Sequence, residues 1–377
     1  MVLTRNNKCI LSICDISPSK LGSFEEFLIS LSKELSINGF KHIIVFRDYP
    51  IPSVEKLLLD AGAVIEILKP SKLSILNLCS FYSLIKRTRP ELVHFHFYPI
   101  YTIVNYLKFF YGIPVIYTDH MGGKKAKNKI KKFLRKPYYY INFLMFDIGI
   151  DRIICVSNFV RRKYYVEYGI KSTKLDVIYN GINVEKFSQR NDTDQILAKY
   201  GIKDEIVISC IGLRTDKGPH YLAKAIPTIL EGIKNLKVIY VGEGECKKPI
   251  QSILEQRNIQ EKVIFTGNVP DLSEVYSISS IVVVPSIFEE AFCFVAAEAM
   301  ASGCCVVAFD SGAINEVLYD TSFVVPKNYK LLGNKVAECL KLNNDCRIGK
   351  KHVIENFSLD TNINHHLVLY NSLINNV

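Results

Sequence analysis

Two glutamates within residues 285–316 carry the clearest chemistry in this sequence. Glu298 is the only charged residue between Glu290 and Asp310, and its neighbours are alanines and a methionine, which are typical of a tightly packed helix. A carboxylate in such surroundings is costly to desolvate unless hydrogen-bond donors meet it. Because eight residues of helix span roughly 12 Å, the two carboxylates can hold two ends of one ligand.

The turn from strand to helix between these glutamates predicts an anion site. The apolar, β-branched run 281–285 favours a buried strand, and residues 292–301 are rich in helix formers. Free N–H groups in the first turn of that helix, near Phe292, Cys293 and Phe294, can bind an anion such as a diphosphate. A diphosphate between two hydroxyl-binding carboxylates describes a nucleotide sugar.

A purely structural interpretation of the same residues stays open. Glu298 would then be a core glutamate that a lysine or a backbone turn satisfies. Glu289 and Glu290 would be a charge pair favoured by the dipole of the helix that follows. Spacing alone does not decide between the two interpretations.

The rest of the chain predicts two domains that position these residues. A chain of 377 residues is too long for one ordinary core, and 49% hydrophobic with 22% charged residues is typical of a globular protein. Strand-like runs alternate with helical runs, such as 24–37 with its apolar helical spacing, which implies α/β domains with doubly wound parallel sheets. The expected strands are 8–16, 42–46, 64–68, 92–95, 114–118, 152–157 and 176–179, then 206–211, 237–241, 263–265, 281–284, 305–309 and 323–325.

Composition also predicts where the protein works. The eleven cysteines show no CxxC pair and no zinc spacing, and several lie in apolar runs, as buried thiols of a reducing cytosol do. The apolar stretch near the N-terminus meets Asp15 too soon to be a signal peptide. No run of about 18 uncharged apolar residues occurs, so we expect no membrane span and a cytoplasmic protein.

The residues around the two glutamates resemble the donor-site pattern of the retaining GT-B glycosyltransferases of family 4, the glycosyl transferases group 1. That pattern is a glutamate, seven residues, a second glutamate and a Gly-Gly turn, and this chain has EEAF, EAMASG and SGA in that order. The resemblance implies two Rossmann-like doubly wound domains facing each other across a cleft. It implies an acceptor domain over 1–187, a donor domain over 188–356 and a helix over 357–377 that crosses back to the first domain.

The resemblance also implies roles for the charged residues. Glu298 would bind the ribose hydroxyls, and Glu290 would hold the sugar hydroxyls and orient the ring. The segment GLRTDKG is similar to the family's phosphate-binding loop, so Arg214 and Lys217 would neutralise the departing diphosphate. An exposed loop with solvated charges is the alternative for these two cations.

Glycines that follow predicted strands mark the edge where a parallel sheet binds its ligand, and Gly242 is one of them. In the family the segment around Asn268 and Val269 flanks the base. Gly22 and Ser23 look like a degenerate form of the family's Gly-Gly loop at the donor site. A serine in the second position narrows the approach of a ligand to the backbone.

Two departures from the family pattern lie next to the donor site. Cys293 stands where the family usually has glycine, and Ala313 replaces the second glycine of the turn that starts at Gly312. If these positions need positive φ, side chains there carry strain and alter the fit of the donor.

Histidines of the first half predict a second cluster of functional groups. His120 in TDHM resembles the family's TxH element, whose histidine lies near the transferred sugar and assists the reaction. His94 and His96 alternate along a strand, and we expect them on opposite faces, where they cannot share a metal ion. No Asp-x-Asp element has a convincing context either, so the expected reaction needs no metal and no cofactor beyond the nucleotide-diphosphate sugar as co-substrate.

The segment 124–145 predicts a contact with an anionic membrane. Its first thirteen residues hold eight basic residues and no acidic one, and aromatic residues follow. A solvated charged face is the alternative. No base-reading module accompanies the patch, so nucleic acid is not an expected partner in spite of the net charge of +10. The expected location is the cytoplasm, at the inner face of the cytoplasmic membrane.

The predicted function is a retaining transfer of a hexosyl group (EC 2.4) from a UDP- or GDP-type sugar to a hydroxyl of a glycan or lipid-linked acceptor, in cell-surface polysaccharide biosynthesis. Two other classes stay open: an epimerase-like GT-B enzyme that needs no sugar acceptor, and a non-catalytic nucleotide-sugar-binding protein, suggested by Cys293 and Ala313. A dinucleotide dehydrogenase is disfavoured because no GxGxxG follows the first strand.

Overall fold

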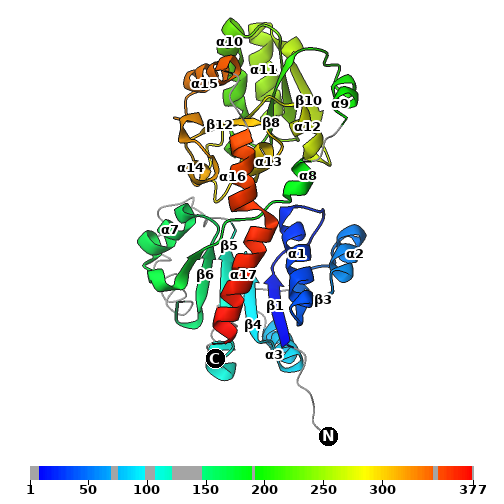
Figure 1. Ribbon diagram of the computed structural model, residues 1–377, viewed down its shortest axis with the longest axis vertical. Coiled ribbons are helices and arrows are strands. Elements are labelled where there is room, and N and C mark those ends of the chain that lie inside the picture. Colours follow the sequence, from blue (N-terminus) through cyan, green and yellow to red (C-terminus); the bar gives the residue numbers. More distant parts are fainter. Residues whose placement is uncertain are drawn as a thin grey trace. The chain divides into compact units, whose positions relative to one another are not determined.

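The computed structural model describes residues 8–68, 75–97, 107–120, 147–188, 192–342 and 347–375 (Figure 1). The chain divides into two compact units, which are unit 1 (Met1–Gly181 with Leu359–Val377) and unit 2 (Ile182–Ser358). Unit 2 begins at Ile182, whose N–H donates to the carbonyl of Phe357 at 2.8 Å, also in unit 2. The domain limit expected after residue 187 instead falls inside a helix of unit 2.

Unit 1 is built on a parallel sheet of seven strands in the order β3-β2-β1-β4-β5-β6-β7. Strands covered on both faces read as continuous apolar runs, and β1 is buried from its second residue to its last. The strands are β1 (Lys8–Cys14), β2 (Phe40–Phe46), β3 (Ala63–Ile67), β4 (Leu92–His96), β5 (Val115–Asp119), β6 (Arg152–Cys155) and β7 (Leu175–Val177).

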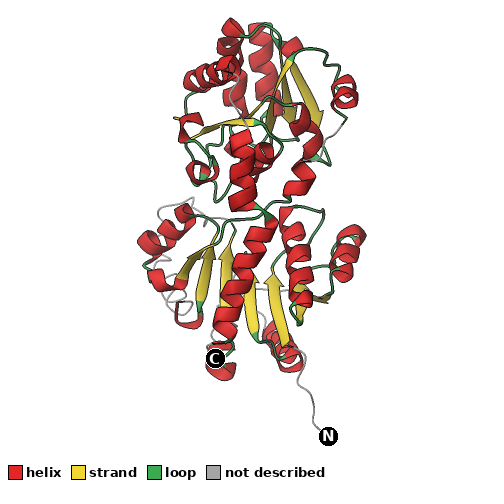
Figure 2. Ribbon diagram, viewed as in Figure 1, coloured by secondary structure: helices red, strands yellow, loops and turns green. Residues whose placement is uncertain are grey.

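The strands of this sheet contact helices α1, α2, α7 and α17 (Figure 2). Helix α1 buries Phe27, Leu28, Leu31 and Leu35, which is the face that the apolar spacing of the sequence predicts. The C-terminal helix α17 packs against α1 and β4, so the end of the chain belongs to unit 1. The helices are α1 (Ser23–Ile37), α2 (Pro52–Asp60), α3 (Ile75–Thr88), α7 (Asn158–Tyr168) and α17 (Leu359–Ile374).

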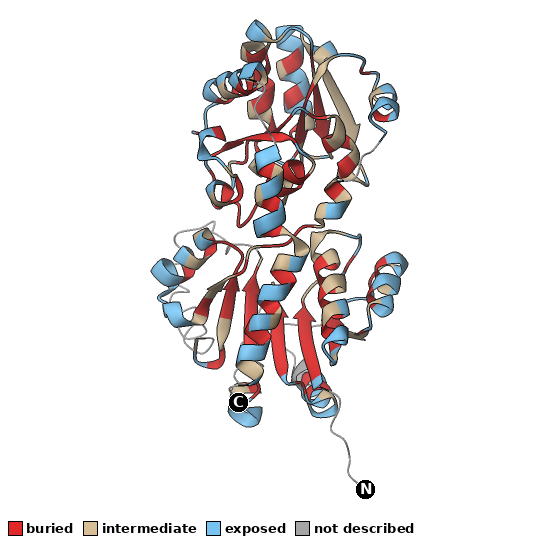
Figure 3. Ribbon diagram, in the orientation of Figure 1, coloured by how far each residue is buried: buried red, intermediate tan, exposed pale blue. Residues whose placement is uncertain are grey.

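Unit 2 repeats the architecture with six parallel strands in the order β10-β9-β8-β11-β12-β13. Most of these strands are buried, and the exposed residues gather on the surrounding helices (Figure 3). The strands are β8 (Ile206–Ile211), β9 (Leu236–Val241), β10 (Val263–Gly267), β11 (Ile281–Val284), β12 (Cys305–Phe309) and β13 (Val324–Val325). The helices are α8 (Val184–Ser188), α9 (Thr193–Lys199), α10 (Pro219–Gly232), α11 (Lys247–Arg257), α12 (Leu272–Ile278), α13 (Phe294–Ala301), α14 (Ile314–Val317), α15 (Tyr329–Leu342) and α16 (Arg347–Phe357).

Each sheet has one point where the strand order reverses. In unit 1 the reversal lies between β1 and β4, and in unit 2 it lies between β8 and β11. Connections leave such a point toward opposite faces of the sheet, which opens a crevice at the carboxyl ends of the two strands. The doubly wound architecture expected from the sequence is thus confirmed, and it places one candidate crevice in each unit.

Two expectations concern segments that the description covers only in part or not at all. The predicted membrane-contact segment 124–145 lies outside the described residues. Within the described ranges, none of the helices combines the length and the apolarity needed to cross a bilayer.

Candidate functional site

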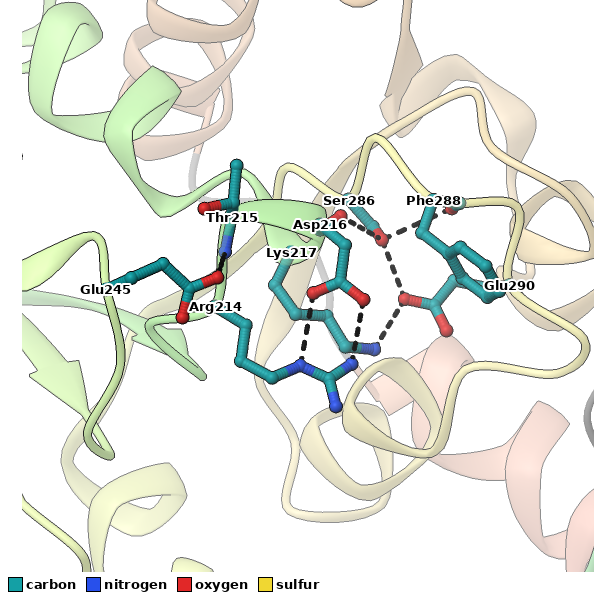
Figure 4. Close-up of polar contacts among 8 residues, drawn as sticks. All are labelled: Arg214, Thr215, Asp216, Lys217, Glu245, Ser286, Phe288 and Glu290. Atoms are coloured by element: carbon teal, nitrogen blue, oxygen red, sulfur yellow. Dashed lines mark hydrogen bonds and ion pairs between the residues drawn. The ribbon is translucent and has the colours of Figure 1, made fainter. Parts of the chain in front are cut away.

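An ion pair between Lys217 and Glu290 occupies the strand-order reversal of unit 2. The Nζ atom of Lys217, on the loop after β8, lies 2.6 Å from Oε1 of Glu290, on the loop after β11 (Figure 4). Ser286 Oγ donates to the same oxygen at 2.7 Å. The side chain of Glu290 is 10% exposed and that of Lys217 is 29% exposed, so the cation faces solvent and remains accessible to a ligand.

Backbone contacts hold these two loops against each other. The N–H groups of Ile287 and Phe288 both donate to the carbonyl of Asp216 at 3.0 Å. Gly218, which begins α10 with φ of 65°, has no room for a side chain, because a Cβ atom would collide with the carbonyl oxygen of Pro285. Lys217 and Glu290 therefore meet because a glycine lets the two strand-end loops touch.

Gly312 gives Glu290 a second fixed neighbour. Glu290 forms an isolated β-bridge with Gly312, and its carbonyl accepts the N–H of Ala313 at 2.8 Å. A Cβ atom on Gly312, whose φ is 66°, would collide with the backbone of Glu290. The turn that starts at Gly312 thus requires glycine, as its place in the sequence pattern suggests.

The two departures from the family pattern differ in the structure. Ala313 has φ of −83°, which any residue adopts, so the strain expected there is absent. Cys293 has φ of 108° at the start of α13, in the region that favours glycine, and strain is present there. Burial, with Glu290 nearby, raises the pKa of the Cys293 thiol to about 12, so this sulfur stays protonated and is no nucleophile at neutral pH.

Arg214 lies on the loop with Lys217 but has a different partner. Its Nε and Nη2 atoms contact the two carboxylate oxygens of Asp216 at 3.1 and 3.0 Å (Figure 4). Both side chains are exposed, and an exposed pair of this kind contributes little to stability, so an anionic ligand can replace Asp216 at small cost. The structure brings Lys217 and Glu290 into contact, whereas Arg214 would have to exchange its partner.

Glu298 is buried in the middle of α13, as its surroundings in the sequence predict. The hydroxyl of Tyr276, on α12, donates to Oε2 of Glu298 at 3.1 Å. Burial and the neighbouring Glu298 raise the pKa of Tyr276, so the phenol keeps its proton. The sequence pattern does not identify Tyr276 as the partner of Glu298, or Ser286 as the partner of Glu290. Only the folded structure brings each hydroxyl to its carboxylate.

Three adjacent strands of unit 2 end in glycines with positive φ. The φ angles of Gly212, Gly242 and Gly267 are 92°, 102° and 68°, and Gly242 donates to the carbonyl of Gly267 at 2.7 Å. They leave the carboxyl ends of β8, β9 and β10 without side chains, where a ligand can approach the backbone. Val269 follows this edge and packs partly buried against a small hydrophobic cluster, while Asn268 is exposed.

The aromatic residues at the start of α13 are mainly structural. Phe292 is 2% exposed, and its ring packs on Phe294 and Phe357 with centroids 5.3 Å away in each case. Only the backbone of Phe292 is therefore suited to contact a ligand. Phe294 is the first residue of α13 and is partly buried.

In unit 1, His120 lies at the carboxyl end of β5, next to the strand-order reversal. It keeps part of its surface accessible, and its Nε2 atom is 3.1 Å from Nδ1 of the fully buried His96. The rings of Phe24 and Phe97 lie 5.1 and 4.8 Å from its ring. Burial, together with His366, lowers the pKa of His120 to about 3, so the imidazole is neutral at pH 7.

His94 and His96 lie on the same face of β4, and the expectation of opposite faces was wrong. Their ring centroids are 3.9 Å apart, because residues two positions apart on a strand share a face. His94 bonds the hydroxyls of Tyr370 and Thr118 at 2.6 and 2.7 Å, which makes it a core residue. Within the described ranges, no group of three or more His, Cys, Asp or Glu side chains is arranged to hold a metal ion.

Gly22 and Ser23 form the N-terminal boundary of α1. Gly22 has φ of −119°, an extended conformation that needs no glycine, and its N–H donates to Oε2 of Glu25 at 3.0 Å. That N–H is therefore already engaged by Glu25, and Ser23 is the first residue of the helix. The loop is close to the crevice of unit 1, since Phe24 packs on His120.

Two family models match the chain, one in each unit. Residues 192–355 match the model described as glycosyl transferases group 1, and residues 24–186 match the model described as glycosyltransferase family 4.

Curated relatives cover part of the chain. An uncharacterized glycosyltransferase of Methanocaldococcus jannaschii is 32% identical over 187 residues, 47% of each chain. The GPI3 subunit of phosphatidylinositol N-acetylglucosaminyltransferase from Saccharomyces cerevisiae is 29% identical over 55% of this chain and 45% of its own. An Escherichia coli UDP-Gal:alpha-D-GlcNAc-diphosphoundecaprenol alpha-1,3-galactosyltransferase is 25% identical over 56% of each. The chain thus spans about half the length of the curated relatives it matches.

Solved structures match almost the whole chain. A glycosyltransferase from Rickettsia africae has a TM-score of 0.83 at 21% identity, with 99% of this chain and 100% of that chain covered. HepE from Anabaena in complex with UDP has a TM-score of 0.79 at 17% identity, with 97% and 100% covered. Likeness at this level of identity establishes the GT-B fold.

Proposed function

Because the chain belongs to the group 1 glycosyltransferases and has their GT-B fold, we propose that it transfers a hexosyl group from a nucleotide-diphosphate sugar to a hydroxyl acceptor. The observation that carries this proposal is the contact between Lys217 and Glu290 at the strand-order reversal of unit 2. A cation for phosphate and a carboxylate for sugar hydroxyls meet there at the edge where such sheets bind ligands.

We assign the donor to unit 2 and the acceptor to unit 1. The ammonium group of Lys217 contacts the carboxylate of Glu290 at 2.6 Å. An arriving diphosphate would take over the ammonium group, with Arg214 as a second cation, and would free Glu290 to accept hydrogen bonds from the sugar hydroxyls. The buried Glu298, fixed by Tyr276, would accept hydrogen bonds from the ribose.

The proposed reaction retains the anomeric configuration. The acceptor hydroxyl attacks the anomeric carbon on the face that the diphosphate leaves, so that one C–O bond forms while the glycosyl–phosphate bond breaks. The acceptor proton passes to the departing phosphate oxygen, and Lys217 stabilises the charge left behind. No side-chain nucleophile is then needed, in keeping with the protonated thiol of Cys293 and the neutral imidazole of His120.

The comparisons support the substrate class. HepE of Anabaena, whose fold this chain shares, binds UDP, which favours a UDP-type donor. The S. cerevisiae and E. coli relatives are named for acceptors that carry a lipid, phosphatidylinositol and a diphosphoundecaprenol. We therefore propose a glycan or lipid-linked acceptor in cell-surface polysaccharide biosynthesis. Segment 124–145, with its basic residues, would then touch the anionic inner face of the cytoplasmic membrane.

Thermal-shift binding of UDP-, GDP-, ADP- and dTDP-sugars, with and without EDTA, tests the donor site. At a hundredfold excess over Kd, a bound donor stabilises the protein by about 2.7 kcal/mol. We expect one nucleotide series to raise the melting temperature, EDTA to leave that rise unchanged, and Glu298→Ala to abolish it. Glu231→Ala, on the exposed side of α10, is the matched control.

The products then separate the enzyme classes. Release of nucleoside diphosphate that depends on an added acceptor supports transfer. Conversion of the donor without an acceptor would indicate an epimerase-like enzyme, and binding without any turnover would indicate a binding protein; either result contradicts the proposal. No shift with any donor would do so as well.

A further inference from the structure

A pair of hydrogen-bonded imidazoles closes the end of strand β4. Nδ1 of His96 and Nε2 of His120 are 3.1 Å apart, and the two rings stack at 5.4 Å with 26° between their planes. His96 is fully buried, whereas His120 keeps an accessible surface. His120 is therefore held on one side by His96.

The other nitrogen of His96 decides which atom carries the proton in this pair. Within the described part of the chain, the buried Nε2 of His96 has no hydrogen-bond partner. A buried N–H without an acceptor is rarer in proteins than a buried lone pair without a donor. His96 therefore carries its proton on Nδ1 and donates it to Nε2 of His120. His120 then carries its own proton on Nδ1.

Backbone strain at Phe97 is a second, independent indication that the surrounding structure fixes the position of the His120 ring. Phe97 directly follows β4 and has φ of 69°, a left-handed conformation that a bulky residue rarely adopts. Its ring packs on His120 and Phe24, each at 4.8 Å, and its carbonyl accepts the hydroxyl of Tyr117 at 3.2 Å. The ring of the strained Phe97 thus packs against His120 and helps to keep it in contact with His96.

We propose that His96 is a positioning residue that fixes His120 in the tautomer protonated on Nδ1, so that His120 offers the ligand a hydrogen-bond donor and not a base. This inference rests on the proposed function and on the resemblance of His120 to the family's histidine, which lies near the transferred sugar. A ligand oxygen would then accept the Nδ1–H bond of His120. No proton is transferred to or from His120 in the reaction, since Nε2 stays bonded to His96.

The tautomer can be measured directly by NMR on the full chain with ¹⁵N-labelled histidine rings. Long-range ¹H–¹⁵N correlations distinguish the two tautomers of a neutral imidazole, and His120→Gln assigns the signal of His120 among the eight histidines. We expect the proton of His120 on Nδ1 in the unsubstituted protein. We expect His96→Leu, which removes the donor, to lose this tautomer, and His96→Asn, whose amide N–H can take the place of Nδ1–H, to keep it.

Transfer assays on the same variants separate positioning from stability. His96→Leu should lower kcat by roughly 10- to 100-fold, the range found when a partner that orients a metal-binding histidine is lost, and His96→Asn should restore most of the lost rate. His42→Leu is the matched control, because His42 is equally buried and its ring nitrogens bond Ser12 and Ser32 and not His120. It should lower stability while leaving the His120 tautomer unchanged.

A proton on Nε2 of His120 in the unsubstituted protein would overturn the inference. So would a His96→Leu variant that keeps both the tautomer and the rate of the unsubstituted protein. Failure of the proposed function looks different: no donor is turned over by any variant, while the NMR measurement still decides whether His96 fixes the tautomer.

Discussion

The strand-order reversals of the two units are alike in topology and opposite in electrostatics. In unit 2 the crevice holds full charges, with Lys217 on Glu290 and Arg214 on Asp216, and strand ends made of glycine. In unit 1, neutral imidazoles and phenylalanine rings surround His120, which follows β5. The ion pair of Arg47 with Asp15 lies on the other side of the reversal, where β2 and β1 end. One topology therefore offers two different sites.

The difference assigns the two crevices to different parts of one reaction. A diphosphate needs cations and backbone N–H groups, which unit 2 provides where side chains are small. A sugar or lipid-linked hydroxyl carries no charge, and neutral hydrogen-bonding rings can hold it without the cost of desolvating an ion. Each crevice also contains one strained non-glycine residue, Phe97 in unit 1 and Cys293 in unit 2. The comparison predicts different responses to loss of charge, to acid and to relief of strain.

Loss of the cation in unit 2 should give the largest effect. Lys217→Met removes the group that stabilises the departing phosphate, and we expect kcat to fall by about 10²- to 10³-fold, as when other preorganised groups that stabilise developing charge are removed. The measurement is steady-state transfer with a saturating donor. Circular dichroism and thermal unfolding check that the variant remains folded.

Lys199→Met is the matched control for this loss. Lys199 also forms an ion pair in unit 2, with Glu274 at 2.7 Å, but this pair is exposed and lies on α9 and α12, away from the loops that carry Lys217 and Glu290. We expect its kcat to stay within about twofold of the unsubstituted protein. Equal losses in the two variants would contradict the assigned role of Lys217 and the division between the units.

Acid should act first on unit 1. The pKa values of His42 and His120 are lowered by burial to about 3, and that of His366 to about 4, from 6.5. Because the unfolded chain binds these protons more readily, the stabilisation is complete above pH 6.5 and is lost as the pH falls toward the folded pKa values. Each histidine then removes at most about 1.4 kcal/mol per pH unit from the free energy of unfolding.

Hydrogen exchange followed by mass spectrometry can locate this loss in the chain. Between pH 6.5 and 4.5, after correction for the intrinsic exchange rate, peptides of unit 1 should lose more protection than peptides of unit 2. His366→Gln should reduce the loss, whereas substitution of its exposed neighbour in His365→Gln should not. Uniform loss over both units would show that buried neutral histidines do not distinguish them.

The fold follows closely from the sequence, because the alternation of apolar runs with helical spacing is a local property. Glu298 could also be identified as a buried carboxylate, since its alanine neighbours show the packing directly. The pairing of Lys217 with Glu290 could not be derived in this way. The two residues are 73 positions apart, and only the touching of two strand-end loops through Gly218 brings them together.

Two features of the fold differ from the sequence-based expectation for physical reasons as well. His94 and His96 were placed on opposite faces, although strand geometry puts residues two apart on one face, and this hid the contact of His96 with His120. Strain was expected equally at Cys293 and Ala313, but φ depends on the hydrogen bonds of each turn. At Ala313 the N–H bonds the Glu290 carbonyl in a turn that places only Gly312 at positive φ.

That contrast between Cys293 and Ala313 gives the smallest predicted effect and the sharpest test of the backbone in unit 2. Cys293→Gly relieves a side chain held at φ of 108° and should raise the free energy of unfolding by up to about 1 kcal/mol, even though glycine loses more entropy on folding. Ala313 has φ of −83° and no strain to relieve, so Ala313→Gly adds only the larger entropy loss of glycine on folding. It should lower the free energy of unfolding by about 0.5–1 kcal/mol. Urea unfolding followed on unit 2 measures both changes. Opposite signs would show that a cysteine is held in a conformation suited to glycine at the start of α13, whereas equal signs would mean that the packing of the buried thiol outweighs the strain.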